Sequence, residues 1–285
     1  MTAVRTTPSA VGAGAAPPAR FRDLLAAEWL RLWALRANRW AFPLTALVLV
    51  AIAANGAFAD YRNWPDYPAG IREQTFVPTW AVRDAFPLPA GMVLLMVVGT
   101  LGALTVVNEY ASGMIRTSLA AVPARRSFLA AKALVLTGVT AVFGVLVVAA
   151  SFAVSQAILA GRDANVGLGD PEVLRSLASS AALAPVGALV GMALGVLLRH
   201  AAATVAGCAL VLILGPSFLN ENDPWTAAVK YAMPLNSWTN LSQIAPDWMP
   251  ALPHTASHLH SWIVLGLWPV LAVGLALALV HRRDL

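Results

Sequence analysis

The sequence has few charged residues. Only 12% of its 285 residues are Asp, Glu, Lys or Arg, while 59% are apolar. Soluble domains have about a quarter of their residues charged. The charged residues also gather between long apolar runs, and the mean hydropathy is +0.69. This pattern excludes an ordinary soluble domain and predicts an all-α integral membrane protein.

Several chemical motifs are absent. The single cysteine, Cys208, excludes an intrachain disulfide and a Cys-rich metal site. No G-x-x-x-x-G-K-[ST] sequence occurs, so the chain has no P-loop with which to hydrolyse a nucleotide. No H-E-x-x-H or G-x-S-x-G sequence occurs either. We therefore expect no enzyme activity and no cofactor in this chain, and any ATP must be used by a partner.

Six apolar runs are long enough to cross a bilayer, since about 20 helical residues reach roughly 30 Å. Before them, residues 1–19 have no periodicity and are predicted to be a disordered tail, whereas residues 20–285 form one transmembrane domain. The predicted spans are residues 40–59, 88–107, 133–160, 178–198, 201–219 and 262–280.

Two further segments are predicted to contact the membrane. Residues 21–39 place apolar side chains at helical spacing, with basic residues on the other face, which predicts an interfacial amphipathic helix. Residues 220–261 are too apolar for a solvated loop. Short helices at residues 225–231 and 235–244 are predicted to dip into the membrane as a re-entrant segment.

The six runs contain no ionisable side chain, although a proton- or sodium-driven transporter needs such groups within its spans. The fourth run contains Gly187, Gly191 and Gly195, a double G-x-x-x-G pattern that lets helix backbones approach closely. We expect this ridge to serve helix packing.

The segment of residues 108–132, hereafter the 108–132 segment, is polar and lies between two of the apolar runs. Because charge is costly inside a bilayer, we expect it to lie in water. Its residues 112–122 are predicted to form a short helix that ends at Pro123. We expect a soluble partner to bind this helix and so to move the two spans attached to it. The charged side chains of the segment are Glu109, Arg116, Arg125, Arg126 and Lys132.

The basic residues predict an orientation. Six spans place both termini on one side, and about two thirds of the 19 Lys and Arg residues fall on that side. The positive-inside rule therefore predicts cytoplasmic N- and C-termini and a cytoplasmic 108–132 segment. The same rule explains the net charge of +5, so we expect no nucleic-acid partner.

The 108–132 segment resembles a family. Its residues E-Y-A-S-G-M-I-R, from Glu109 to Arg116, are similar to the E-Y-x-x-G-x-I-R segment of type-2 ATP-binding-cassette exporter permeases. Residues 122–132 resemble the V-P-x-R-x-x-x-L-x-A-K sequence that follows in that family. The resemblance implies that the coupling to the ATPase runs through Glu109, Gly113, Arg116, Pro123, Arg125 and Arg126.

The resemblance also implies an assembly. A permease of this kind works in the bacterial plasma membrane with two P-loop ATPase subunits, which bind ATP and Mg²⁺, and with a second permease copy or a sister permease. Residues 21–39 would then lie at the membrane surface and residues 112–122 would dock on the ATPase. Because the spans lack buried charge, we expect an amphipathic or lipophilic cargo such as a drug, antibiotic or lipid.

Two alternatives remain open from the sequence. The first is a non-transporting membrane scaffold or immunity protein, in which the 108–132 segment is a simple loop. The second is a metal-dependent intramembrane enzyme, in which His254, His258 and His260 bind zinc.

Overall fold

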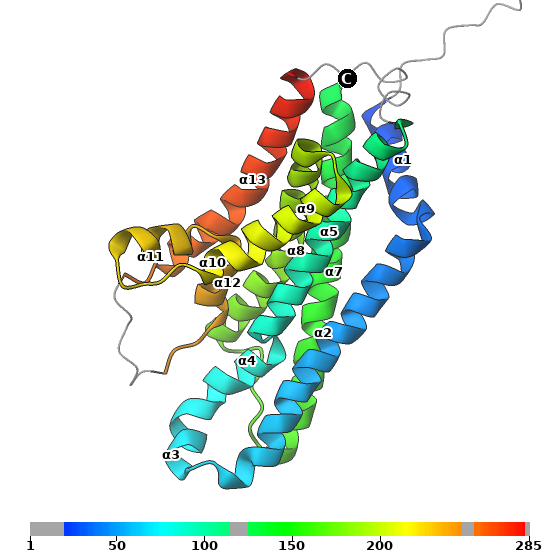
Figure 1. Ribbon diagram of the computed structural model, residues 1–285. Coiled ribbons are helices and arrows are strands. Elements are labelled where there is room, and N and C mark those ends of the chain that lie inside the picture. The colour runs from blue at the N-terminus through cyan, green and yellow to red at the C-terminus, as the bar shows by residue number, and fades with distance from the viewer. Residues whose placement is uncertain (1–19, 115–124, 247–253, 283–285) are drawn as a thin grey trace, which may run out of the picture.

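The structure, a computed structural model, describes residues 20–114, 125–246 and 254–282. Within these ranges every regular element is helical, and the helices form one elongated bundle (Figure 1). Five of the described helical stretches are long and apolar enough to cross a membrane, as a multi-pass membrane protein requires. These stretches are Arg36–Asp66, Thr75–Ala111, Arg126–Arg162, Pro171–Leu198 and His258–Leu279.

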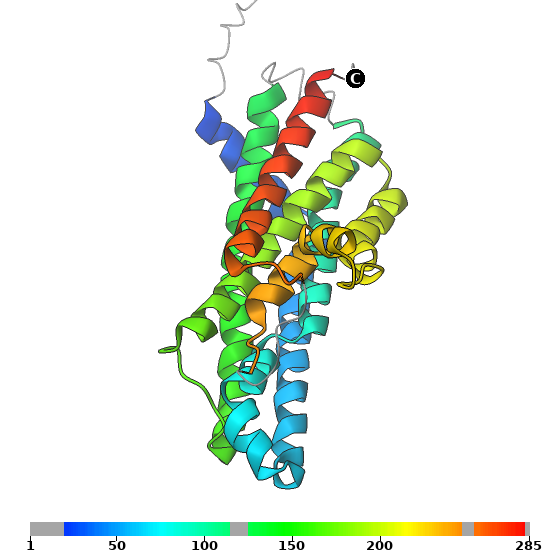
Figure 2. The same ribbon diagram turned by 90° about the vertical axis from the view of Figure 1, so that its left-hand side faces the viewer.

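The two ends of the bundle differ. Helix α1 (Phe21–Ala34) lies at one end, together with the C-terminal end of α13 (His258–Arg282), as Figures 1 and 2 show. The short helix α3 (Ala69–Ile71) lies at the opposite end. We call these the α1 end and the α3 end.

Helix α1 is followed directly by α2 (Arg36–Asn63), with only Leu35 in an extended conformation between them. The predicted boundary after residue 39 is therefore wrong by a few residues. The last carbonyls of a helix need donors from outside it. Here the side chain of Asn38 donates to the carbonyl of Leu32 at 2.8 Å, and Arg39 Nε donates to that of Trp33 at 2.6 Å. These two bonds end α1 and turn the chain into α2.

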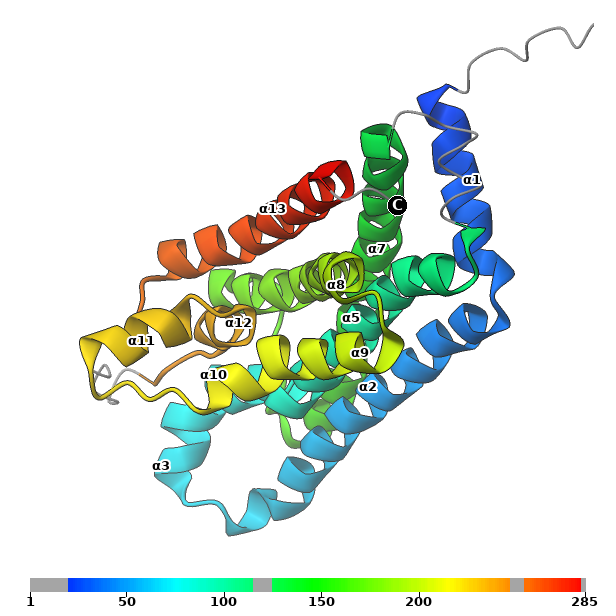
Figure 3. The same cartoon turned by 45° about the horizontal axis from the view of Figure 1, so that its top comes forward.

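Helices α5 (Leu88–Ala111) and α8 (Pro171–Leu198) form the centre of the bundle. Figure 3 shows α8 surrounded by α5, α7, α9, α12 and α13. The two central helices approach closely because glycines meet backbone: a Cβ on Gly191 would overlap the carbonyl of Gly99, and one on Gly195 would lie 2.8 Å from the carbonyl oxygen of Ala103. The structure thus places the predicted glycine ridge, Gly187 included, against α5 of the same chain.

Helix α7 (Arg125–Leu159) continues into the short helix η3 (Ala160–Arg162) and packs against α1, α2 and α8. It begins several residues before the predicted span. Helix α8 also begins earlier than predicted, because Asp170 caps it by accepting a hydrogen bond from the amide of Glu172 at 2.8 Å. It ends where Arg199 adopts a left-handed conformation, with φ at 54°.

The predicted fifth span, residues 201–219, differs from the other five. It consists of α9 (Ala201–Ala209), the π-helical η4 (Leu210–Leu214) and α10 (Gly215–Ser217). Its apolar helix, Ala201–Leu214, reaches only about 21 Å at about 1.5 Å per residue, less than a hydrocarbon core of about 30 Å. Five long helices are thus seen within the described residues, and a sixth crossing stays a prediction.

Two short helices occur where the sequence predicts them, before α13. They are α11 (Pro224–Tyr231) and α12 (Pro234–Ser242), and each begins with a proline, which suits the first turn of a helix. Trp238 of α12 is buried in the bundle core, whereas Trp225 of α11 is 83% exposed. Their entry into a membrane stays a prediction.

Residues 60–87, which lie between the first two predicted spans, are largely helical and form the α3 end. After α2 it contains η1 (Trp64–Asp66), α3, the π-helical η2 (Arg72–Trp80) and α4 (Ala81–Ala85). The rings of Trp64, Tyr67, Phe76 and Trp80 pack edge to face and hold these pieces together.

Candidate functional site: a buried charge cluster at the α1 end

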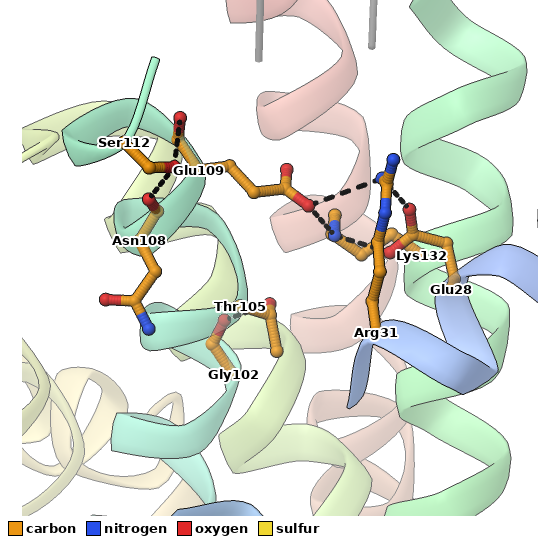
Figure 4. Close-up of polar contacts among 8 residues, drawn as sticks. All are labelled: Glu28, Arg31, Gly102, Thr105, Asn108, Glu109, Ser112 and Lys132. Carbon is orange, nitrogen blue, oxygen red and sulfur yellow. Dashed lines mark hydrogen bonds and ion pairs between the residues drawn. The ribbon is translucent and has the colours of Figure 1, made fainter. Parts of the chain in front are cut away.

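Four charged side chains from three helices meet at the α1 end, and we call them the charge cluster. Glu28 and Arg31 lie one turn apart on α1, Glu109 lies in the last turn of α5, and Lys132 lies in α7. Lys132 Nζ donates to Glu28 Oε2 at 2.5 Å and to Glu109 Oε1 at 2.8 Å. Figure 4 shows Lys132 between the two carboxylates.

Arg31 completes the charge cluster. Its guanidinium lies 2.7 Å from Glu28 Oε1 and 3.6 Å from Glu109 Oε1. The ring of Phe128, one turn before Lys132, lies 5.3 Å from the Lys132 ammonium and 5.5 Å from the Arg31 guanidinium. Two carboxylates thus face two cations, and an aromatic ring covers both cations.

Burial makes these contacts significant. Glu28, Glu109 and Lys132 are each 5% exposed or less, whereas Arg31 is 37% exposed. Exposed ion pairs contribute little because water screens them, but a buried charge that loses its partner costs several kcal/mol. The charge cluster therefore fixes α1, α5 and α7 relative to one another.

Within the 108–132 segment, Asn108 is exposed as expected, but Glu109 and Lys132 are buried in the bundle rather than solvated. Helix α5 continues through Glu109, and α7 begins before Lys132, so both charges lie on helices of the bundle. They are buried there because each neutralises the other. The described counterions of Glu109 are Lys132 and Arg31.

The structure describes only some of the predicted coupling residues. Gly113 ends α5 in a left-handed conformation, with φ at 70°, which glycine adopts without strain. Arg125 begins α7, and Arg126 is exposed there. Arg116, Pro123 and most of the predicted helix 112–122 lie outside the described residues.

A cavity of about 340 Å³ lies beside the charge cluster. Glu28, Arg31, Glu109 and Lys132 line it together with apolar residues of α1, α5 and α7 and with four uncharged polar residues, Asn38, Thr105, Asn108 and Ser112. The second carboxylate oxygen of Glu109, Oε2, is buried and accepts no hydrogen bond from the residues that the structure describes. This site therefore combines a network of ion pairs with an adjoining cavity.

A second polar network lies at the α3 end. Arg83 NH2 lies 3.2 Å from Asp60 Oδ2 and 3.4 Å from Asp84 Oδ1, and the Tyr67 hydroxyl donates to Asp60 Oδ1 at 2.7 Å. Burial and the neighbouring Asp60 carboxylate raise the pKa of Tyr67 to about 12. Asp60 and Asp84 are buried on α2 and α4, within the long apolar stretches. Acids near the ends of these stretches are thus partnered by Arg83.

The three histidines of the metal alternative do not form a site. Over residues 20–114, 125–246 and 254–282, no three His, Cys, Asp or Glu side chains gather closely enough to hold a metal ion. His254 has a left-handed backbone, whereas His258 and His260 begin α13. The described residues therefore contain no set of side chains that could bind the zinc ion of this alternative.

Comparison with known proteins adds no assignment. The chain matches no model of a known protein family, and no curated protein matches it. Its function must therefore be argued from its residues and their geometry.

Proposed function

We propose that this chain is the membrane-spanning permease subunit of an ATP-driven exporter. In this proposal it forms the translocation path and couples through the 108–132 segment to a separate P-loop ATPase. The observation that carries the proposal is the charge cluster, which joins the two helices flanking that segment to each other and to α1. The similarity of residues 109–116 and 122–132 to exporter permeases supports it.

The geometry supports a mechanical role for this segment. Glu109 lies just before the segment's middle part, and Lys132 lies just after it. Their ion pair ties the end of α5 to the start of α7, and Glu28 ties both to α1. A force applied to residues 112–124 would therefore move three helices together. An ATPase that changes shape on binding nucleotide would transmit its motion in this way.

The proposed orientation places the α1 end in the cytoplasm. The described ends of the chain both lie at that end (Figures 1 and 2), and the basic residues near them satisfy the positive-inside rule. The helices α9 to α12 would then supply the sixth crossing and the external re-entrant segment. The working unit would contain two permeases and two ATPases in a bacterial plasma membrane.

The test is a tagged pull-down from native membranes in mild detergent. We compare the wild type with Arg116→Glu and Arg126→Glu, which reverse charge within the 108–132 segment but outside the charge cluster. Arg22→Glu is the matched control, because Arg22 is an exposed arginine of α1 at the same end. Reversing a charge that meets a partner's charge costs several kcal/mol, so recovery of a P-loop ATPase should fall at least about tenfold in both variants.

Equal amounts of permease in the membrane are required for each variant. If Arg22→Glu also loses the ATPase, the effect is general and the docking of this segment is contradicted. If the wild type recovers no ATPase in several detergents, the exporter proposal fails and a scaffold or immunity role takes its place.

A further inference from the structure

The cavity beside the charge cluster has the character of a ligand site. Its volume of about 340 Å³ falls at the lower end of the range for small-molecule pockets, about 300–1,000 Å³. Such pockets are mostly apolar, with a few polar groups that fix orientation. Here the apolar walls come from α1, α5, α7 and the residues that join α1 to α2, and they include Leu32, Leu35, Leu104, Val135 and Leu136.

One buried oxygen beside the cavity lacks a hydrogen-bond partner among the described residues. Lys132 and Arg31 lie on the Oε1 side of the Glu109 carboxylate, and Oε2 has no donor among the described residues. Figure 4 shows Oε2 pointing away from the dashed contacts. Leaving a buried acceptor unpaired is unfavourable. The terminal torsion of a glutamate is broad, so a small rotation presents this oxygen to the cavity.

The charges of the site select the polar head of a ligand. A carboxylate or phosphate head would face an anionic oxygen that lacks a donor. An ammonium head would add a third cation beside Lys132 and Arg31, in a cluster whose two carboxylates already balance them. An uncharged donor completes the hydrogen bonding of Oε2 without excess charge.

We propose that this cavity binds an uncharged amphiphile. Its hydroxyl or amide N–H donates to Glu109 Oε2, and its apolar body lies against Leu104, Val135 and Leu136. The inference stands on the cavity alone and does not need the ATPase partner proposed above.

The experiment uses the purified full-length chain in lipid nanodiscs and a long-chain alcohol that carries a photoreactive diazirine. Labelled peptides are identified by mass spectrometry, and unlabelled alcohol competes. The corresponding carboxylic acid, primary amine and plain hydrocarbon, each with the same chain and diazirine, test the choice of head group.

Three variants separate the part of the site that binds the polar head of the ligand from the part that binds its apolar body. Glu109→Gln keeps the side-chain shape and an acceptor for Lys132, but it replaces the open oxygen by an amide donor. Val135→Trp places a large ring at a residue that lines the cavity and leaves all four charged side chains of the charge cluster in place. Leu134→Trp is its matched control, because Leu134 is the neighbouring residue on α7 and its side chain is 55% exposed.

The proposal expects saturable labelling of the α5 and α7 segments that line the cavity. Glu109→Gln should raise the half-saturating alcohol concentration about tenfold, as loss of a hydrogen bond to a charged group does. Val135→Trp should abolish the labelling, and Leu134→Trp should leave it unchanged. Both tryptophan variants must keep the wild-type gel-filtration profile.

Three outcomes would overturn the proposal. Equal labelling by the plain hydrocarbon would show apolar partitioning with no role for Glu109. Stronger labelling by the amine, lost in Glu109→Gln, would show that the site takes a cation. Absence of saturable labelling in the cavity would remove the site altogether, and the ATPase pull-down would stand or fall independently of it.

Discussion

Replacing Lys132 by methionine tests whether the charge cluster holds the α1 end together. Methionine has a similar length and keeps the apolar part of the side chain, so the change removes mainly the ammonium. The ammonium donates at 2.5 Å to Glu28 and at 2.8 Å to Glu109, and both carboxylates are 5% exposed or less. Without it, Arg31 is the one cation that the described residues leave beside two buried carboxylates.

The expected loss of stability follows from the burial. Removing one partner of a buried ion pair costs about 3–5 kcal/mol, because the remaining charge stays desolvated. For chains of about this size, 1 kcal/mol shifts the unfolding midpoint by roughly 2–4 °C. Lys132→Met should therefore unfold about 10 °C below the wild type, as measured by a thermal-shift assay in detergent.

A second variant makes the test specific. The double change Lys132→Met and Glu28→Gln removes one cation and one anion, so it should recover at least about 1 kcal/mol relative to Lys132→Met alone. Arg22→Met removes an exposed cation of α1 and should shift stability by no more than about 0.5 kcal/mol. If Lys132→Met behaves like Arg22→Met, or if the double variant recovers nothing, the argument from buried charge is refuted.

Three further changes test the rest of the structure. Gly191→Ala places a methyl group against a backbone carbonyl of α5 and should cost about 3 kcal/mol, whereas Gly138→Ala meets no atom within 4 Å and should cost nothing in the same thermal assay. Trp238→Phe loses a 2.9 Å hydrogen bond to a buried hydroxyl of α8 and should cost about 1–3 kcal/mol, whereas Trp225→Phe, at an exposed position, should leave the unfolding midpoint unchanged. The phenol of Tyr67 keeps its proton until about pH 12, so its contribution to stability is complete below pH 10 and is lost as the pH rises from 10 to 12. The absorbance difference between wild type and Tyr67→Phe should show a titration midpoint near pH 12, and a midpoint near 10 would contradict the hydrogen bond from Tyr67 to Asp60.

The apolar runs predict most of the bundle, because a helix in a bilayer must satisfy its own backbone. Their ends are harder to place. Helix α5 runs past residue 107 to Ala111, and α7 begins at Arg125 rather than near residue 133. A span predicted from hydropathy ends at the first charged residue. A helix continues past a charged residue that finds a buried partner. The ends of helices therefore depend on contacts between segments that lie far apart in the sequence.

The fifth apolar run shows a feature that composition does not predict. The chain is helical from Ala201 to Ser217, but it turns π-helical at Leu210–Leu214. Gly215 and Pro216, which do not favour the interior of an α-helix, follow directly. Composition alone does not locate such a change in the type of helix.

The burial of one member of the charge cluster, Glu28, could have been found from the sequence. Glu28 lies four residues from Leu24 and from Leu32, so it lies on the apolar face of its own helix. An acid on such a face requires a partner. Nothing in the sequence identifies that partner, because Lys132 is 104 positions away and its approach depends on how α1 packs against α7. Pairing over such a distance is a property of the fold.

The charge cluster also explains why α1 stays with the bundle at all. Leu24 and Leu32 are its only buried apolar side chains, while Trp29 and Leu30 are more than half exposed. Apolar burial alone would let such a short helix shift along α7, because hydrophobic contacts are not directional. Glu28 of α1 accepts from Lys132 of α7, and Arg31 of α1 faces Glu109 of α5, so a shift of even one turn would break both contacts. The charges thus fix the register of α1, and a motion that moves α5 or α7 must either carry α1 with it or break a buried ion pair.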